Sequence, residues 1–281
     1  MSVQFTILGS GSSGNCAYLE TGDARILVDA GFSPLQIRKR LASIGRTPEN
    51  LTAILITHEH SDHISGLFGL ADKLHIPIFC NRGTQDGTVW AFKTKWLRKK
   101  TAADGPDAAE QLKARMDWRL FETGARFEIG DVGIETFSIP HDAQDPVGYI
   151  LNTAAGKIGF VTDLGHVTKL VLERIRTANI LVLESNHDVK LLQDCPHRPW
   201  SLKQRILGRH GHLSNAAAAE AVAQIMSAGL KQLYLAHLSR ECNRPELARN
   251  IMAEQLHQIG ATHVELQVAA QNQPGATLKL S

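Results

Sequence analysis

The amino-acid sequence predicts a mixed α/β fold built from two similar halves. Short apolar runs bounded by turn residues indicate strands, and longer segments with apolar residues at helical spacing indicate helices. Polar residues repeatedly follow the ends of the apolar runs. With 281 residues, 43% of them hydrophobic, the chain is long enough for one large or two small domains. We expect one domain over residues 1–281, with a surface insertion around residues 93–118.

The composition is that of an ordinary soluble protein and leaves the partner open. Charged residues make up 21% and the net charge is +2, so only a local basic patch could indicate a nucleic-acid partner. No apolar run reaches transmembrane length, and the N-terminus lacks a secretion signal. The four cysteines show no Cys-x-x-Cys spacing, which suggests free thiols in a reducing cytoplasm. We therefore expect a cytoplasmic protein without a membrane partner.

Three strands and one helix are predicted at the start of the chain, the strands over residues 3–8, 16–20 and 26–29 and the helix over 34–44. The loop at 9–15 contains only glycine, serine and asparagine. Such a loop can approach a ligand with its backbone amides, but a flexible turn is an equally good interpretation. Asp29 ends the third strand, where a lone aspartate is usually a turn or cap residue.

The densest polar cluster follows a strand predicted at residues 53–56 and comprises His58, His60, Asp62 and His63. His58 and His60 are two positions apart, so they cannot share a helical face and suit an extended turn. Ser61 is the expected N-cap of a helix whose buried stripe is Ile64, Leu67, Ala71 and Leu74. Imidazoles and a carboxylate at a strand end suit zinc, manganese or iron. Polar loops that carry four such groups in six positions by chance are rare.

A basic and aromatic segment follows the strand predicted at residues 76–80. The helix expected there carries Trp90, Phe92 and Trp96, interleaved or followed by the basic residues Lys93, Lys95, Arg98, Lys99 and Lys100. Basic and aromatic residues in this arrangement could track a phosphate backbone. A solvated amphipathic face explains the same pattern equally well.

The rest of the chain repeats the pattern of strands that end in polar residues. Strands are predicted in several runs over 118–137 and at 147–151, 158–162, 180–183, 232–236 and 264–268. Five strand ends carry a histidine or an aspartate, namely His58, His141, Asp163, His187 and His237. Structural histidines would scatter over helices and loops. The recurrence therefore predicts one site, assembled where several strands end.

The order of these residues resembles that of the metallo-β-lactamase-fold hydrolases. The match consists of His58-x-His60-x-Asp62-His63, followed by His141, Asp163 and His237. Within that superfamily the chain looks most like the bacterial YycJ (WalJ) group of DNA exonucleases, on motifs at residues 9–15, 29–31, 140–143, 184–188, 211–215 and 235–239. The resemblance implies an α/β fold of four layers, an αβ/βα sandwich with two facing mixed sheets and the site along one edge.

The resemblance also implies a site for two divalent ions, zinc or manganese, with iron also possible. His58, His60 and His141 would hold one ion, Asp62, His63 and His237 would hold the second, and Asp163 would bridge both. Adjacent dications need a bridging anion to lower their repulsion, and a water between them becomes acidic enough to act as hydroxide. Asp62 could orient that hydroxide, and Asp29 would hold a ligand histidine in its tautomer.

The expected function is a metal-dependent phosphodiesterase that hydrolyses nucleic acid, specifically a 5′-to-3′ DNA exonuclease. Only the resemblance favours DNA over RNA. A small-molecule hydrolase that splits a cyclic phosphodiester, lactone, thioester or lactam is the alternative on the same fold. A non-catalytic metal-binding protein is a third hypothesis, against which the intact ligand set argues.

Phosphodiester cleavage expels an alkoxide, and a positioned acid makes it leave more easily. The metal ligands cannot serve, because their lone pairs are committed to the metals. His212 is the candidate, since it lies near a helix start where backbone amides favour a phosphate, and His187 is the second choice. His212 could instead simply cap or pack that helix. Substrate phosphate contacts are expected from Ser10, Ser12, Ser13, Asn15, Ser214 and Asn215.

Overall fold

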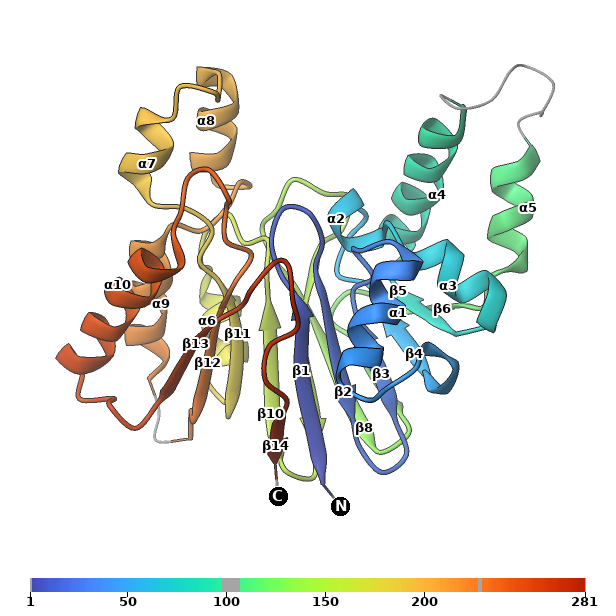
Figure 1. The fold of residues 1–281 in the computed structure, drawn as a ribbon, viewed down its shortest axis with the longest axis horizontal. Coiled ribbons are helices and arrows are strands. Elements are labelled where there is room, and N and C mark those ends of the chain that lie inside the picture. Colours follow the sequence, from blue (N-terminus) through green and yellow to red (C-terminus); the bar gives the residue numbers. More distant parts are fainter. Residues whose placement is uncertain (1, 98–106, 227–228, 281) are drawn as a thin grey trace.

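The protein folds into two facing mixed sheets of seven strands each, with helices on the outer face of each sheet (Figure 1). The structure is a computed structural model that describes residues 2–97, 107–226 and 229–280, with the backbone alone described at 95–97, 107–109 and 112. The arrangement confirms the four-layer sandwich expected from the resemblance. No helix in these described ranges is long and apolar enough to cross a membrane.

The first sheet brings a set of parallel strand ends to one edge. Its strands, in spatial order, are β14 (Leu278–Leu280), β1 (Val3–Gly9), β2 (Cys16–Glu20), β3 (Arg25–Val28), β4 (Ala53–Leu55), β5 (Ile78–Cys80) and β6 (Trp118–Leu120). Strands β3 to β6 pair in parallel. Asp29, which follows β3, and the histidine loop after β4 therefore reach the same edge.

The second sheet repeats this arrangement. Its strands, in spatial order, are β13 (Glu265–Val268), β12 (Gln232–Ala236), β11 (Ile180–Glu184), β10 (Gly156–Val161), β9 (Val147–Thr153), β8 (Val132–Ser138) and β7 (Arg126–Ile129). Strands β10 to β13 pair in parallel, and β8 runs the same way as β10 because each is antiparallel to β9. The residues that follow β8, β10, β11 and β12 therefore meet at one edge.

The helices fall into two sets, one for each sheet. The first set is α1 (Pro34–Ser43), α2 (Ser61–Ile64), α3 (Leu67–Leu74), α4 (Arg82–Leu97) and α5 (Asp107–Arg115). The second set is α6 (Lys169–Ile175), α7 (Val189–Asp194), α8 (Trp200–Leu207), α9 (Asn215–Ile225) and α10 (Pro245–Gln258). Figure 1 shows α4 and α5 rising above one side of the sheet edge and α7 and α8 above the other.

The surface insertion expected around residues 93–118 is described only in part, because residues 98–106 lie outside the described ranges. Its described portion contains the end of α4, helix α5 and the start of β6. Of the predicted basic segment, Lys93 is half-buried. The Lys95 side chain and the residues Arg98, Lys99 and Lys100 lie outside the described part of the chain.

The single helix predicted after the histidine loop, with Ser61 as its N-cap, is wrong. The helix that begins there, α2, has His60 as its N-cap, because the His60 carbonyl accepts hydrogen bonds from the amides of His63 and Ile64 at 2.9 and 3.2 Å. The helix also breaks at Gly66, whose amide donates to Ala30 at 2.8 Å. A Cβ at Gly66 would lie 2.2 Å from the Phe32 carbonyl oxygen, so only glycine allows this close approach.

Apolar side chains between the two sheets form the central core, and further cores lie under the helices of each sheet. Tyr149 on β9 is fully buried in the central core, and its hydroxyl donates to the Ile56 carbonyl at 2.6 Å. Each large apolar side chain buried in this way stabilises the fold by about 1.5–3 kcal/mol. The Tyr149 bond joins the second sheet to the segment that carries His58, so the central core also fixes the histidine loop.

Candidate metal centre

The strand ends bring the seven predicted ligands into two adjacent clusters. One cluster contains His58, His60 and His141, and the other contains Asp62, His63, Asp163 and His237. Within each cluster one ligand atom per residue lies within 4.8 Å of the others. Asp163 connects the clusters, because its oxygens lie 3.1 Å from His63 Nε2 and 3.7 Å from His141 Nε2.

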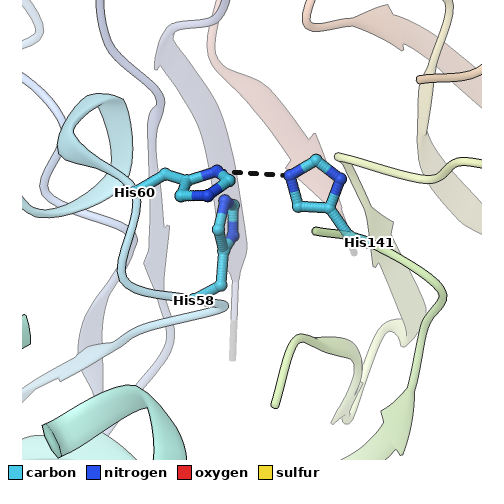
Figure 2. Close-up of side chains that lie close together, drawn as sticks. All are labelled: His58, His60 and His141. Atoms are coloured by element: carbon cyan, nitrogen blue, oxygen red, sulfur yellow. Dashed lines mark hydrogen bonds between the residues drawn. The ribbon is translucent and has the colours of Figure 1, made fainter. Parts of the chain in front are cut away.

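The histidine cluster has the donor geometry of a metal site. Figure 2 shows the rings of His58, His60 and His141 converging, with His60 Nδ1 3.3 Å from His141 Nε2. His141 donates Nδ1–H to the Gly211 carbonyl at 3.0 Å, which leaves Nε2 as its lone-pair atom. The His58 Nε2 atom is buried and has no hydrogen-bond partner within the described residues. A buried nitrogen in this state fits a metal ligand.

His58 and His141 are also held in the neutral form that binds metals. Burial, followed by the charge on His63, lowers the pKa of His58 well below its usual range. Burial likewise lowers the pKa of His141. Only neutral imidazole offers a lone pair to a cation, so the site is prepared for a metal ion near neutral pH.

The second cluster is rich in carboxylates. Asp62 Oδ2 lies 3.3 Å from His237 Nε2 and 3.5 Å from His63 Nε2. Burial alone would lower the pKa values of His63 and His237, but Asp163 and the other nearby carboxylates raise both well above the usual value. The carboxylates thus give this cluster excess negative charge, which bound divalent cations can neutralise.

Asp29 has the contact expected of it. Its Oδ2 atom accepts Nδ1–H of His63 at 2.7 Å, and its Oδ1 atom accepts the Thr57 amide at 2.9 Å. Both Asp29 and His63 are fully buried. The bond fixes the His63 tautomer, so that Nε2 faces Asp62 and Asp163.

Glu184 is a site residue that the sequence reasoning missed. Its Oε1 atom accepts Nδ1–H of His237 at 2.7 Å and Nδ1–H of His212 at 2.9 Å. Its Oε2 atom accepts the amides of Leu164 and Leu213, both at 2.8 Å. Burial raises its pKa, but the charge on His212 and these bonds outweigh burial and lower the pKa to about 2. Glu184 therefore orients two histidines as an anion.

Three residues of the site have a left-handed backbone conformation, which is rare outside glycine. Asp29, Asp163 and His237 have φ angles of 61°, 60° and 55°, and each lies one or two positions after a strand. Left-handed backbone at a non-glycine residue costs roughly 1–3 kcal/mol and persists only where the surroundings enforce it. The strain turns all three side chains toward the shared edge.

The predicted phosphate contacts are mostly engaged inside the protein. Ser10 donates to the Asn15 side chain and accepts the His237 amide, both at 2.8 Å. Ser214 caps α9, and Asn215 is buried against Ser185. The remaining two lie nearer the surface: Ser13 accepts a bond from Arg240, and Ser12 lines a cavity at the site. Of the six, Ser12 has the position closest to the one expected.

That cavity has a volume of about 180 Å³ and adjoins the histidine cluster. Its lining includes His60, His141, His212, Arg198 and Arg205. His212 is thus brought to the cavity wall, whereas His187 is buried with 1% of its surface exposed. Burial lowers the pKa of His187 to about 4.

Known proteins are similar to this chain in sequence. A family model described as a beta-lactamase superfamily domain matches residues 24–238. Exodeoxyribonuclease WalJ of Streptococcus pneumoniae serotype 2 is 40% identical over 255 residues, which cover 91% of this chain and 88% of that protein. Exodeoxyribonuclease YycJ of Bacillus anthracis is 36% identical over 260 residues, which cover 92% and 91%.

A solved structure agrees with the fold. The metallo-beta-lactamase fold protein YhfI from Bacillus subtilis superposes with a TM-score of 0.65 at 14% identity, over 98% of this chain and 99% of that one. At this identity the likeness concerns the fold alone. The sequence relatives match along nearly their whole length, and the family model spans both halves of the ligand set. The chain therefore belongs to the metallo-β-lactamase-fold hydrolases and is an enzyme of the YycJ type.

Proposed function

We propose that this hydrolase is a metal-dependent phosphodiesterase that degrades DNA from the 5′ end. The observation that carries the proposal is the meeting of seven histidine and aspartate side chains beside a cavity lined by arginines and His212. Arg205 and Arg198 at that cavity are paired with Asp142 at 2.6 Å and Glu241 at 2.9 Å. Their guanidinium groups attract a phosphodiester to the cavity. The relatives named exodeoxyribonuclease favour DNA over RNA as the substrate.

In this proposal each cluster would hold one divalent ion. His58, His60 and His141 would hold the first, Asp62, His63 and His237 would hold the second, and Asp163 would lie between them. Bound ions would acidify a water molecule and stabilise the charge on the phosphoryl oxygens. Imidazole and carboxylate ligands suit zinc and manganese, and iron is also compatible.

The acid for the leaving alkoxide is His212. Its ring is 23% exposed at the cavity, and its Nδ1–H is committed to Glu184, so Nε2 is the ring atom that can face substrate. The Glu184 carboxylate accepts the Nδ1–H bond and so fixes the orientation of the His212 ring at the cavity. His187 has a pKa of about 4, so it is neutral near pH 7 and has no acidic proton to give.

The substrate class is tested by incubating metal-loaded protein with end-labelled single-stranded DNA, double-stranded DNA, RNA and a chromogenic phosphodiester. We expect mononucleotides from the 5′ end of DNA. Faster hydrolysis of RNA, or of the small phosphodiester with DNA left intact, would replace the proposal with an RNase or a small-molecule hydrolase on the same centre.

The acid assignment is tested with His212→Ala at full metal content. We expect the rate on DNA to fall by about a hundred-fold or more, in the range typical of a lost general acid. On a substrate with p-nitrophenolate as the leaving group the loss is much smaller, because that group leaves without protonation. An equal loss on both substrates would mean that His212 binds phosphate or supports the fold.

A further inference from the structure

A second and larger cavity is also lined by His60. Its volume is about 540 Å³, and its lining includes Glu59, His60, Asp86, Gly87, Trp90 and Gln144. His60 also lines the smaller cavity that holds His212 and the arginines. The two cavities therefore share His60, a candidate ligand of the metal centre.

Trp90 is a strongly exposed aromatic residue in the lining of this larger cavity. It lies on α4 with 68% of its surface exposed, while its neighbours Thr88 and Val89 are buried. A large aromatic ring held in water beside a metal centre is the kind of exposed surface that binds a partner. An indole ring stacks favourably on any planar aromatic ligand.

The cavity wall beside Trp90 is fixed rather than adaptable. The Glu59 carboxylate accepts the Gln144 amide at 2.8 Å, which ties the histidine loop to the segment after His141. A Cβ at Gly87 would lie 2.6 Å from Glu59 Cγ, so a side chain at position 87 would force either Glu59 or α4 to shift. Gly87 thus lets α4 hold Trp90 close to His60.

The charge of this cavity distinguishes a base from a phosphate. Glu59 and Asp86 place carboxylates in its wall, although Asp86 is paired with Lys113 at 3.1 Å. Carboxylates repel a phosphodiester but not a neutral nucleobase. The smaller cavity differs in that its lining carries two arginines, Arg198 and Arg205, beside one carboxylate, Asp142.

We propose that Trp90 is a base-binding residue, whose indole ring stacks on a nucleobase next to the phosphate being cleaved. The proposal rests on the proposed function, since it requires a nucleic-acid strand at the metal centre. Stacking on an indole accepts every base, because each has a similar aromatic face, so the subsite adds affinity with little sequence preference.

The test combines Trp90→Ala with DNA that carries a single abasic site next to the cleaved phosphate. We expect either change alone to lower kcat/KM by roughly tenfold, which lies within the range measured for loss of one stacked base. We expect the two changes together to cost no more than one of them, because each removes the same contact. Trp90→Phe should recover most of the activity, and Trp200→Ala, which removes an equally large ring that is 60% exposed on α8, should leave it unchanged.

The possible outcomes separate this inference from the proposed function. Additive effects of Trp90→Ala and the abasic site would show that Trp90 does not contact that base. Unchanged kcat/KM for Trp90→Ala on intact DNA would also overturn the inference, and both results leave DNA hydrolysis by the wild-type protein intact. Absence of DNA cleavage by the metal-loaded wild-type protein would instead refute the proposed function and this inference together.

Discussion

Replacing Glu184 by glutamine changes one oxygen to nitrogen at the centre of the site. All four groups around the carboxylate donate hydrogen bonds, namely the two histidine rings and the amides of Leu164 and Leu213. A glutamine amide has one accepting end and one donating end. In either orientation its NH₂ group faces two donors, and the negative charge that all four donors face is lost.

The size of the effect follows from those bonds. A hydrogen bond to a charged group is worth about 1.5–3 kcal/mol, so loss of the two bonds that the NH₂ group cannot accept costs about 3–6 kcal/mol. If the cost falls on the transition state, the rate decreases by about a hundred-fold to ten-thousand-fold, because each 1.36 kcal/mol is tenfold. Part of the cost also weakens metal binding through His237, so the rate must be measured at saturating metal.

The assay is kcat/KM for Glu184→Gln on 5′-labelled DNA, with metal content measured in the same sample. Glu49→Gln is the matched control, because Glu49 is exposed on the surface and forms an ion pair with Arg38. We expect the control to retain full activity. Glu184→Gln with full metal and a rate within threefold of wild type would refute the role assigned to Glu184.

Three further predictions concern the Asp163 bridge, the buried His187 and the basic segment after Trp90. Asp163→Ala should lose most of the bound metal and nearly all activity, as measured by elemental analysis and DNA hydrolysis; full retention of both would refute the bridging role. Because burial lowers the folded-state pKa of His187 to about 4 while the unfolded value is about 6.5, its contribution to stability falls as pH decreases through that window. Urea denaturation should therefore show wild type losing about 1.6 kcal/mol more than His187→Gln between pH 6.5 and pH 5, and parallel losses would contradict this. The basic residues after Trp90 are Lys93, Lys95, Arg98, Lys99 and Lys100. If they line a phosphate path, neutralising several of them should weaken DNA binding and reduce the log–log slope of its salt dependence by about 0.9 per lost contact on duplex DNA. Hydrolysis of a small phosphodiester should stay unchanged.

The fold and the ligand candidates could be predicted because their signals are local. Each ligand lies within a few positions of an apolar run, and parallel strands place such positions at one edge. Glu184 is the last residue of the buried strand β11, so it also lies at a strand end. Four polar residues follow it, and the sequence did not distinguish it from them. Its role became visible only when the histidines of two distant segments met at its oxygens.

Other features depend on contacts between distant parts of the chain. β14 has only three residues and pairs with β1 at the other end of the sequence, so no local pattern indicated it. The break at Gly66 arises because residues 30–32 pack against it, a contact that helical periodicity cannot anticipate. The serines and asparagines expected to contact phosphate were chosen by residue type, and most of them bond to their own fold instead.

The central claim, that two metal ions on these seven ligands drive DNA hydrolysis, is tested by titrating chelator-treated protein with Mn²⁺. Bound metal per chain and the rate of mononucleotide release from 5′-labelled DNA are measured on the same samples. The account predicts a rate that reaches its maximum at two bound ions per chain and that is nearly absent in metal-free protein. Full activity in protein that elemental analysis shows to be metal-free, or a maximum at one bound ion, would contradict it.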